Sequence, residues 1–197
     1  MSPIVLLPLT AVVTFGVTNI DDLFVLALFF SQTRSGFRIR HIVAGHYLGF
    51  SALVAISLVG FLGGRMLPEA WVGLLGLVPI LIGIRRWIQR HDPPFHANVG
   101  ATASVTTVAV ATFANGADNI GVYTPLFASS DMTRLWVTLV IFYVLLAVWC
   151  VLGYALTRHP VVARGMARYP HIIVPLILIG LGVYIMVQSG TFQLFGL

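Results

Sequence analysis

The stretch Thr18-Asn19-Ile20-Asp21-Asp22 lies inside an apolar segment that runs from Pro3 to Gln32. A straight helix of this length, at about 1.5 Å per residue, would be far longer than the ~30 Å hydrocarbon core of a bilayer. A second long apolar segment, Ala103–Ser130, contains the polar stretch Asn115-Gly116-Ala117-Asp118-Asn119. We therefore expect both segments to be helices that are broken near residues 18–21 and 115–118.

The composition is that of a membrane protein. Hydrophobic residues make up 58% of the chain and charged residues 9%, and the mean hydropathy is +0.97. Soluble domains carry about 25% charged residues. We predict an all-α integral membrane protein whose partner is the lipid bilayer, with one transmembrane domain over residues 1–197. All eleven basic residues are Arg and lie in short gaps between apolar runs, so no nucleic-acid partner is predicted.

Six apolar segments are long enough to be considered membrane-spanning helices. The third segment has the shortest apolar stretch for crossing a bilayer, because only the residues between Glu69 and Arg85 are uncharged. The segments are Pro3–Gln32, Ile42–Leu62, Glu69–Arg86, Ala103–Ser130, Leu135–Thr157 and Ile172–Gln188.

The two broken segments belong to an internal repeat. A shift of 97 residues places Asp21 on Asp118 and Val25 on Val122. The first repeat covers about residues 1–90 and the second about 100–197, with three spans in each. Because three is an odd number, the second copy enters the membrane from the opposite side. The sequence thus predicts two inverted three-helix repeats, an arrangement typical of carriers that alternate between two faces.

Three of the six acidic residues of the chain, Asp21, Asp22 and Asp118, are predicted inside the membrane. An unpaired carboxylate there costs at least about 2.5–3.5 kcal/mol. The spans offer no Arg or Lys as a partner, so the expected counter-charge is a metal cation or protons. Two alternatives stay open: the first span ends at Ile20 and a re-entrant segment follows, or the neighbouring Asn residues serve only helix packing.

The candidate ligands are mostly oxygen donors, which suit manganese, calcium or zinc at least as well as cadmium. His46 is an additional candidate ligand through nitrogen, although a packing histidine is the simpler interpretation. We favour a packing role for Cys150 as well, the single cysteine of the chain. The predicted metal ligands are Asp21, Asp22, Asp118, Asn19, Asn115 and Asn119.

The two polar motifs resemble those of the cadmium-resistance transporter (CadD) family. The second, Asn115-Gly116-Ala117-Asp118-Asn119-Ile120-Gly121-Val122-Tyr123-Thr124-Pro125-Leu126-Phe127, is long and specific, and the similarity runs over essentially the whole chain. At the position of His46 the family more often has glutamine, a difference that bears on the choice of metal. The family belongs to the LysE-type exporter superfamily, so the resemblance implies efflux of a divalent cation such as cadmium.

We therefore predict a secondary transporter that exports a divalent metal, of the cadmium type or else zinc or manganese, in exchange for protons. Asp21 and Asp118 are expected to face each other near the midplane and to bind the cation together. An enzyme is not predicted, because no HExxH, Ser-His dyad or P-loop motif is present, and no cofactor is expected. The alternatives are a LysE-type exporter of a small organic cation or amino acid, and a cation channel. Assembly into a homo-oligomer is also possible from the sequence.

The positive-inside rule predicts the orientation in the cell membrane. The first, third and fifth gaps together hold nine Arg residues, whereas the second and fourth hold only Arg65 and Arg134. The Arg-rich gaps are expected in the cytoplasm, which places both termini outside. A reporter that is active only in the cytoplasm should be inactive when it is fused after Leu197. Activity of that fusion would contradict the orientation.

Overall fold

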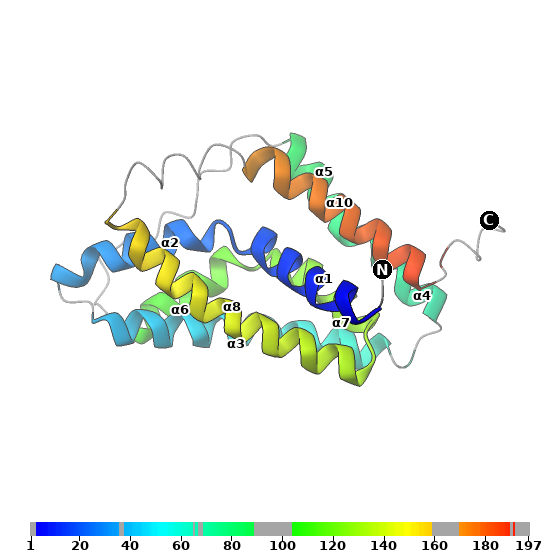
Figure 1. Cartoon of the computed structure of the whole chain (residues 1–197), viewed down its shortest axis with the longest axis horizontal. Helices are drawn as coiled ribbons and strands as arrows, with labels where there is room; N and C mark the ends of the chain where they lie inside the picture. Colours follow the sequence, from blue (N-terminus) through cyan, green and yellow to red (C-terminus); the bar gives the residue numbers. More distant parts are fainter. Residues whose placement is uncertain are drawn as a thin grey trace.

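The computed structural model describes residues 3–35, 38–64, 66, 69–88, 104–158, 170–189 and 191. These residues form helices and turns without a strand, which agrees with the predicted all-α class (Figure 1). Arg65, Arg90, Arg164 and Arg168, and the predicted repeat boundary at residues 90–100, lie outside the described residues. The helices are α1 Pro3–Thr18, α2 Asp22–Ser31, η1 Gln32–Ser35, α3 Ile39–Gly64, α4 Glu69–Leu74, α5 Leu77–Ile88, α6 Val105–Asn115, α7 Asn119–Ala128, α8 Met132–Leu156 and α10 Pro170–Gln188.

Both predicted helix breaks are confirmed. Helix α1 ends at Thr18 and α2 begins at Asp22, and the two helices are bent by 57° relative to each other. Helix α6 ends at Asn115 and α7 begins at Asn119, so each boundary of the first break recurs 97 residues later. Each break is a short turn: Asp21 (φ −70°, ψ −32°) and Asp118 (φ −73°, ψ −20°) keep right-handed helical dihedral angles.

Three of the predicted spans correspond to helical units that can cross a bilayer by length and composition. Helices α3 and α8 do so as single helices, and α1 with α2 does so as a bent pair. The other apolar helices of the described residues are shorter. The predicted third span is divided into α4 and α5. Pro79, in the first turn of α5, has no N–H to continue a helix from the residues before it, which explains the division.

The helices pack in three groups. The broken pair α1 and α2 lies along α8, the broken pair α6 and α7 lies along α3, and α5 lies along α10 (Figure 1). Between α1, α3, α7 and α8 the core is aromatic. Phe15, Phe50, Tyr123 and Phe142 are all fully buried there, with ring centroids 5.0–6.2 Å apart.

Glycine residues allow α3 to approach α6 closely. A Cβ atom added at Gly49 would lie 2.5 Å from the carbonyl oxygen of Ala109 and 2.8 Å from Cβ of Thr112. Gly45, one turn earlier on α3, meets Val108 and Val105 in the same way. Small residues at such contacts are the usual means of close helix packing in lipid. This contact fixes α6, and with it Asn115, against α3.

The variant Gly49→Ala should therefore be less stable by about 1–3 kcal/mol, because the added methyl group forces α3 and α6 apart. Unfolding by SDS in mixed micelles, followed by circular dichroism, would measure the change. Gly63→Ala is a matched control on the same helix, since a Cβ there meets no atom within 4 Å. Equal stability of the two variants would show that the α3–α6 contact is not tightly packed.

Candidate cation site at the two helix breaks

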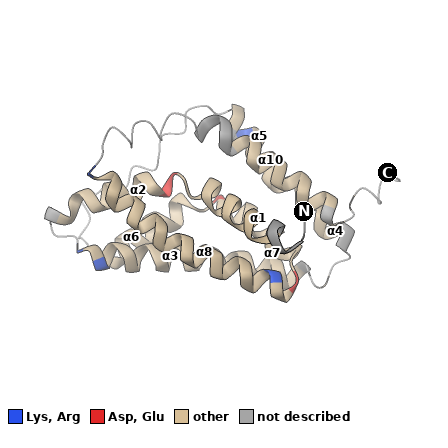
Figure 2. Ribbon diagram, in the orientation of Figure 1, with Lys and Arg blue, Asp and Glu red and all other residues tan. Residues whose placement is uncertain are grey.

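The polar residues of the two breaks lie inside the protein. The exposed fractions are 0% for Asn19, 1% for Asp22 and 2% for Asn119, and Asp21 and Asp118 are partly buried. Two acidic segments lie at the helix breaks in the middle of the molecule, and a third lies beside a basic segment at the start of α8 (Figure 2). The three acidic residues that are predicted inside the membrane, Asp21, Asp22 and Asp118, thus lie in the middle of the fold, and their depth in the bilayer stays a prediction.

Two hydrogen bonds join the first break to the second. Asn115 Nδ2 donates to Asp22 Oδ1 at 2.6 Å, and Asn119 Nδ2 donates to Asn19 Oδ1 at 3.5 Å. The carboxylate of Asp22 is also within electrostatic reach of those of Asp21 and Asp118. The fold therefore gathers residues that are about a hundred positions apart in the sequence into one buried cluster, which we call the break cluster: Asn19, Asp21, Asp22, Asn115, Asp118 and Asn119.

Hydroxyl and indole groups that were not among the predicted ligands surround Asn19. Its Nδ2 donates to the Tyr123 hydroxyl at 2.7 Å, and that hydroxyl shares a 2.9 Å hydrogen bond with Thr18 Oγ1. Trp149 Nε1 donates to the Asn19 carbonyl oxygen at 2.7 Å. A sequence signal existed for both aromatic residues: Tyr123 follows Asn119 by one helical turn, and Trp149 lies far from the predicted membrane edges.

His46 and Cys150 lie in other surroundings. His46 Nδ1 lies 3.2 Å from Thr112 Oγ1 on α6, and the side chain is 1% exposed. Its Nε2 has no hydrogen-bond partner among the described residues. Cys150 packs in an apolar cluster with Val25 and Phe29, although Asp22 lies within electrostatic reach of its thiol. The hydrogen bond of His46 thus joins α3 to α6, whereas those of the break cluster join the two breaks.

The break cluster offers oxygen ligands in place of a compact metal cage. Among the described residues, no three His, Cys, Asp or Glu side chains are close enough together to hold a metal ion. Asp22 Oδ2 is buried and accepts no hydrogen bond from those residues. One carboxylate oxygen is thus free for a cation, and the amide oxygens of the Asn residues are the nearest candidates to share it.

Comparison with known proteins identifies the family. A family model described as cadmium resistance transporter matches residues 15–196. The chain belongs to this family. The match includes both breaks and the whole break cluster, so the cluster belongs to the part of the chain that the family shares. With the apolar helices, membership makes the chain a membrane transport protein of the cadmium-resistance type. No curated protein and no solved structure matches the chain.

The Trp149 hydrogen bond leads to a prediction about the first break. Trp149→Phe keeps an aromatic ring against Phe15, whose ring is 5.2 Å away, but removes the donor to Asn19. We expect a loss of about 0.5–1.5 kcal/mol in the free energy of unfolding, the usual net value of one hydrogen bond. SDS titration in micelles would measure it, with the exposed Trp136→Phe as the control. An equal effect of both variants would contradict this role.

Proposed function

We propose that this cadmium resistance transporter exports a divalent cation by alternating access, with the break cluster as the transport site and protons as the exchanged ion. The observation that carries the proposal is the pair of hydrogen bonds between the breaks, Asn115 to Asp22 and Asn119 to Asn19. They bring acidic and amide groups of both halves of the chain together in a buried place, which is where an inverted-repeat carrier binds its substrate.

The packing supports six spans arranged as two inverted repeats. Under the repeat, α1 and α2 correspond to α6 and α7, α3 corresponds to α8, and α4 with α5 corresponds to α10. The contact of α1 and α2 with α8 is then equivalent to the contact of α6 and α7 with α3. Corresponding elements run in opposite directions, and α1 begins at the same end of the molecule at which α10 ends (Figure 1). Both features are expected of an inverted repeat whose two termini lie on the same side of the membrane.

The charge of the break cluster supports a cation as the substrate. Asp21, Asp22 and Asp118 contribute carboxylates, and the chain has no basic residue between Met1 and Thr33 or between Ala101 and Thr133. A substrate carboxylate, as in an amino acid, would have no positive partner here. A divalent cation would neutralise the carboxylates and use the amide oxygens as further ligands. Cadmium is the substrate that the family name gives, and zinc and manganese suit the same oxygen donors.

Cation binding requires one local rearrangement. In the structure Asn115 turns its amide nitrogen toward Asp22 Oδ1. Rotation of the amide about its Cβ–Cγ bond presents the Asn115 oxygen instead, so that two oxygen atoms face the same point. The Asp22 Oδ2 atom, which accepts no hydrogen bond from the described residues, adds a third. His46 remains an additional candidate ligand, and its hydrogen-bond partner Thr112 lies about one turn of α6 before Asn115.

Release of the cation would leave several carboxylates close together away from water. Such groups are costly as anions, so they take up protons when the metal departs. The protons are carried back as the transporter returns to its inward-facing state. Export of the metal is then driven by the entry of protons into the cell.

Transport in vesicles with an imposed pH gradient tests this mechanism. Asp21→Asn, Asp22→Asn and Asp118→Asn should each lower cadmium-dependent proton movement at least about tenfold, because each removes a charged ligand. Glu69→Gln, which removes a carboxylate at the start of α4, should transport normally. Wild-type activity of Asp118→Asn would refute the shared site, and cadmium transport that is indifferent to the pH gradient would refute proton exchange.

A further inference from the structure

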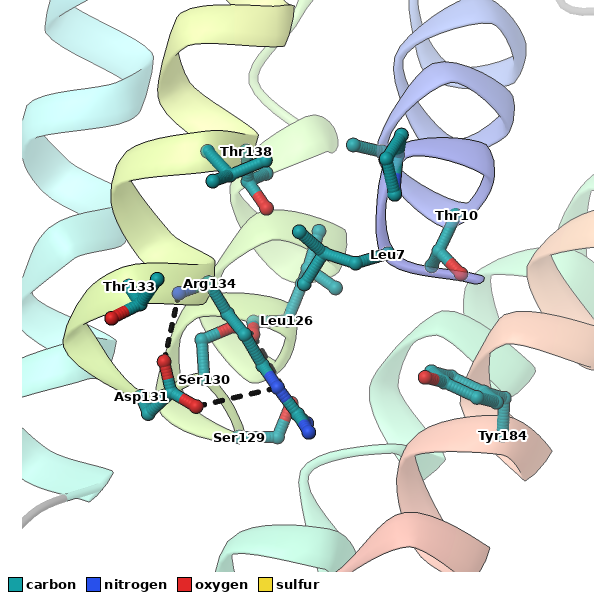
Figure 3. A pocket seen from close by; sticks show the side chains of 13 residues that line it. Leu7, Thr10, Leu126, Ser129, Ser130, Asp131, Thr133, Arg134, Thr138 and Tyr184 are labelled. Atoms are coloured by element: carbon teal, nitrogen blue, oxygen red, sulfur yellow. Dashed lines mark hydrogen bonds and ion pairs between the residues drawn. The ribbon is translucent and has the colours of Figure 1, made fainter. Parts of the chain in front are cut away.

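Two adjoining cavities lie at the end of α1 that is farther from the first break. The larger has a volume of about 620 Å³ and lies between α1, α10, the end of α7 and the start of α8 (Figure 3). Thr10 of α1, Thr138 of α8 and Tyr184 of α10 are among its lining residues. The smaller, of about 280 Å³, shares Thr10 and Tyr184 with the first and extends along α1 to Thr14.

A row of threonines continues from these cavities to the break cluster. Thr10, Thr14 and Thr18 are spaced four residues apart and therefore lie on one face of α1. Burial increases along the row: Thr10 is partly buried, and Thr14 and Thr18 are buried. Thr18 Oγ1 then accepts a 2.9 Å hydrogen bond from Asn19 Nδ2. Hydroxyl groups thus lead from the cavities to the first residue of the break cluster.

The outer part of the larger cavity is polar and charged. Asp131 and Arg134 form an exposed ion pair there, with 3.3 Å between Arg134 Nε and Asp131 Oδ2. Ser129, Ser130 and Thr133 also line this part (Figure 3). The rest of the lining is mostly apolar, so the ion pair and the hydroxyl groups favour water over lipid chains in this outer part of the cavity.

We propose that the two cavities are the water-filled exit vestibule of the transporter, and that the Thr10, Thr14 and Thr18 face of α1 conducts a partly hydrated divalent cation into it from the break cluster. This inference rests on the proposed export function. Hydroxyl oxygens replace water ligands of such a cation one at a time, which lowers the cost of leaving the carboxylates. The hydrogen bond between Thr18 and Tyr123 lies between the inner end of the vestibule, at Thr14, and the break cluster, so exit requires this contact to open.

Cysteine labelling tests the vestibule. In a Cys150→Ala background, Thr10→Cys is compared with Val12→Cys, which lies on the same helix, is 43% exposed and lines neither cavity. A membrane-impermeant methanethiosulfonate reagent is added outside intact cells. Thr10→Cys should react at least about tenfold faster, because the reagent attacks the thiolate, which forms only in contact with water. Labelled Thr10→Cys should lose cadmium efflux.

Equal and slow labelling of the two positions would show that the cavities are not open to water outside the cell, and would overturn the proposal. Rapid labelling of Thr10→Cys that leaves cadmium efflux intact would overturn it too, because the cavity would lie off the pathway. Thr14→Val offers a second measurement, since it removes a hydroxyl at nearly constant volume; we expect slower efflux than with Val12→Thr. The labelling result does not depend on the carboxylate variants, so failure of the shared carboxylate site and failure of the vestibule are distinguishable.

Discussion

A helix that breaks inside a membrane leaves polar backbone groups that lipid cannot satisfy, and the arrangement around the breaks follows from this constraint. The carbonyl group of Asn19 would bond to an amide one turn later in an unbroken helix. Here it accepts the indole N–H of Trp149 from α8. The break of α1 and α2 is therefore tolerated because α8 is packed beside it.

The same constraint makes the two breaks depend on each other. Asp22, at the start of α2, obtains its hydrogen bond from Asn115, the last residue of α6. Asn115 reaches it because the glycines of α3 hold α6 close to the centre of the molecule. A change on α3, far from any carboxylate in the sequence, can thus alter the surroundings of Asp22. The helix packing and the chemistry of the site share one set of contacts.

The positions of the breaks could be predicted from sequence because they depend on local features: polar and glycine residues inside segments too long for the bilayer, repeated after 97 residues. The side chains that form hydrogen bonds across the breaks could not be predicted from sequence. A repeat relates Asp21 to Asp118 as equivalent positions but does not say which side chains touch, and the bond that forms is from Asn115 to Asp22. That Asp21 and Asp118 face each other and bind the cation together stays a prediction. The division of α4 from α5 could not be predicted from hydropathy, because Pro79 is apolar and leaves the run of apolar residues uninterrupted.

Amide partners have a consequence for transport that basic partners would not have. An Arg or Lys beside Asp22 would neutralise it permanently and would repel an arriving metal cation. Asn115 stabilises the carboxylate by a hydrogen bond and leaves its charge in place. The amide carries a donor and an acceptor on one rotatable group. It can therefore donate a hydrogen bond to Asp22 in one orientation and coordinate a cation through its oxygen in the other. A neutral partner of this kind lets the same carboxylate alternate between a stable resting state and an ion-binding state.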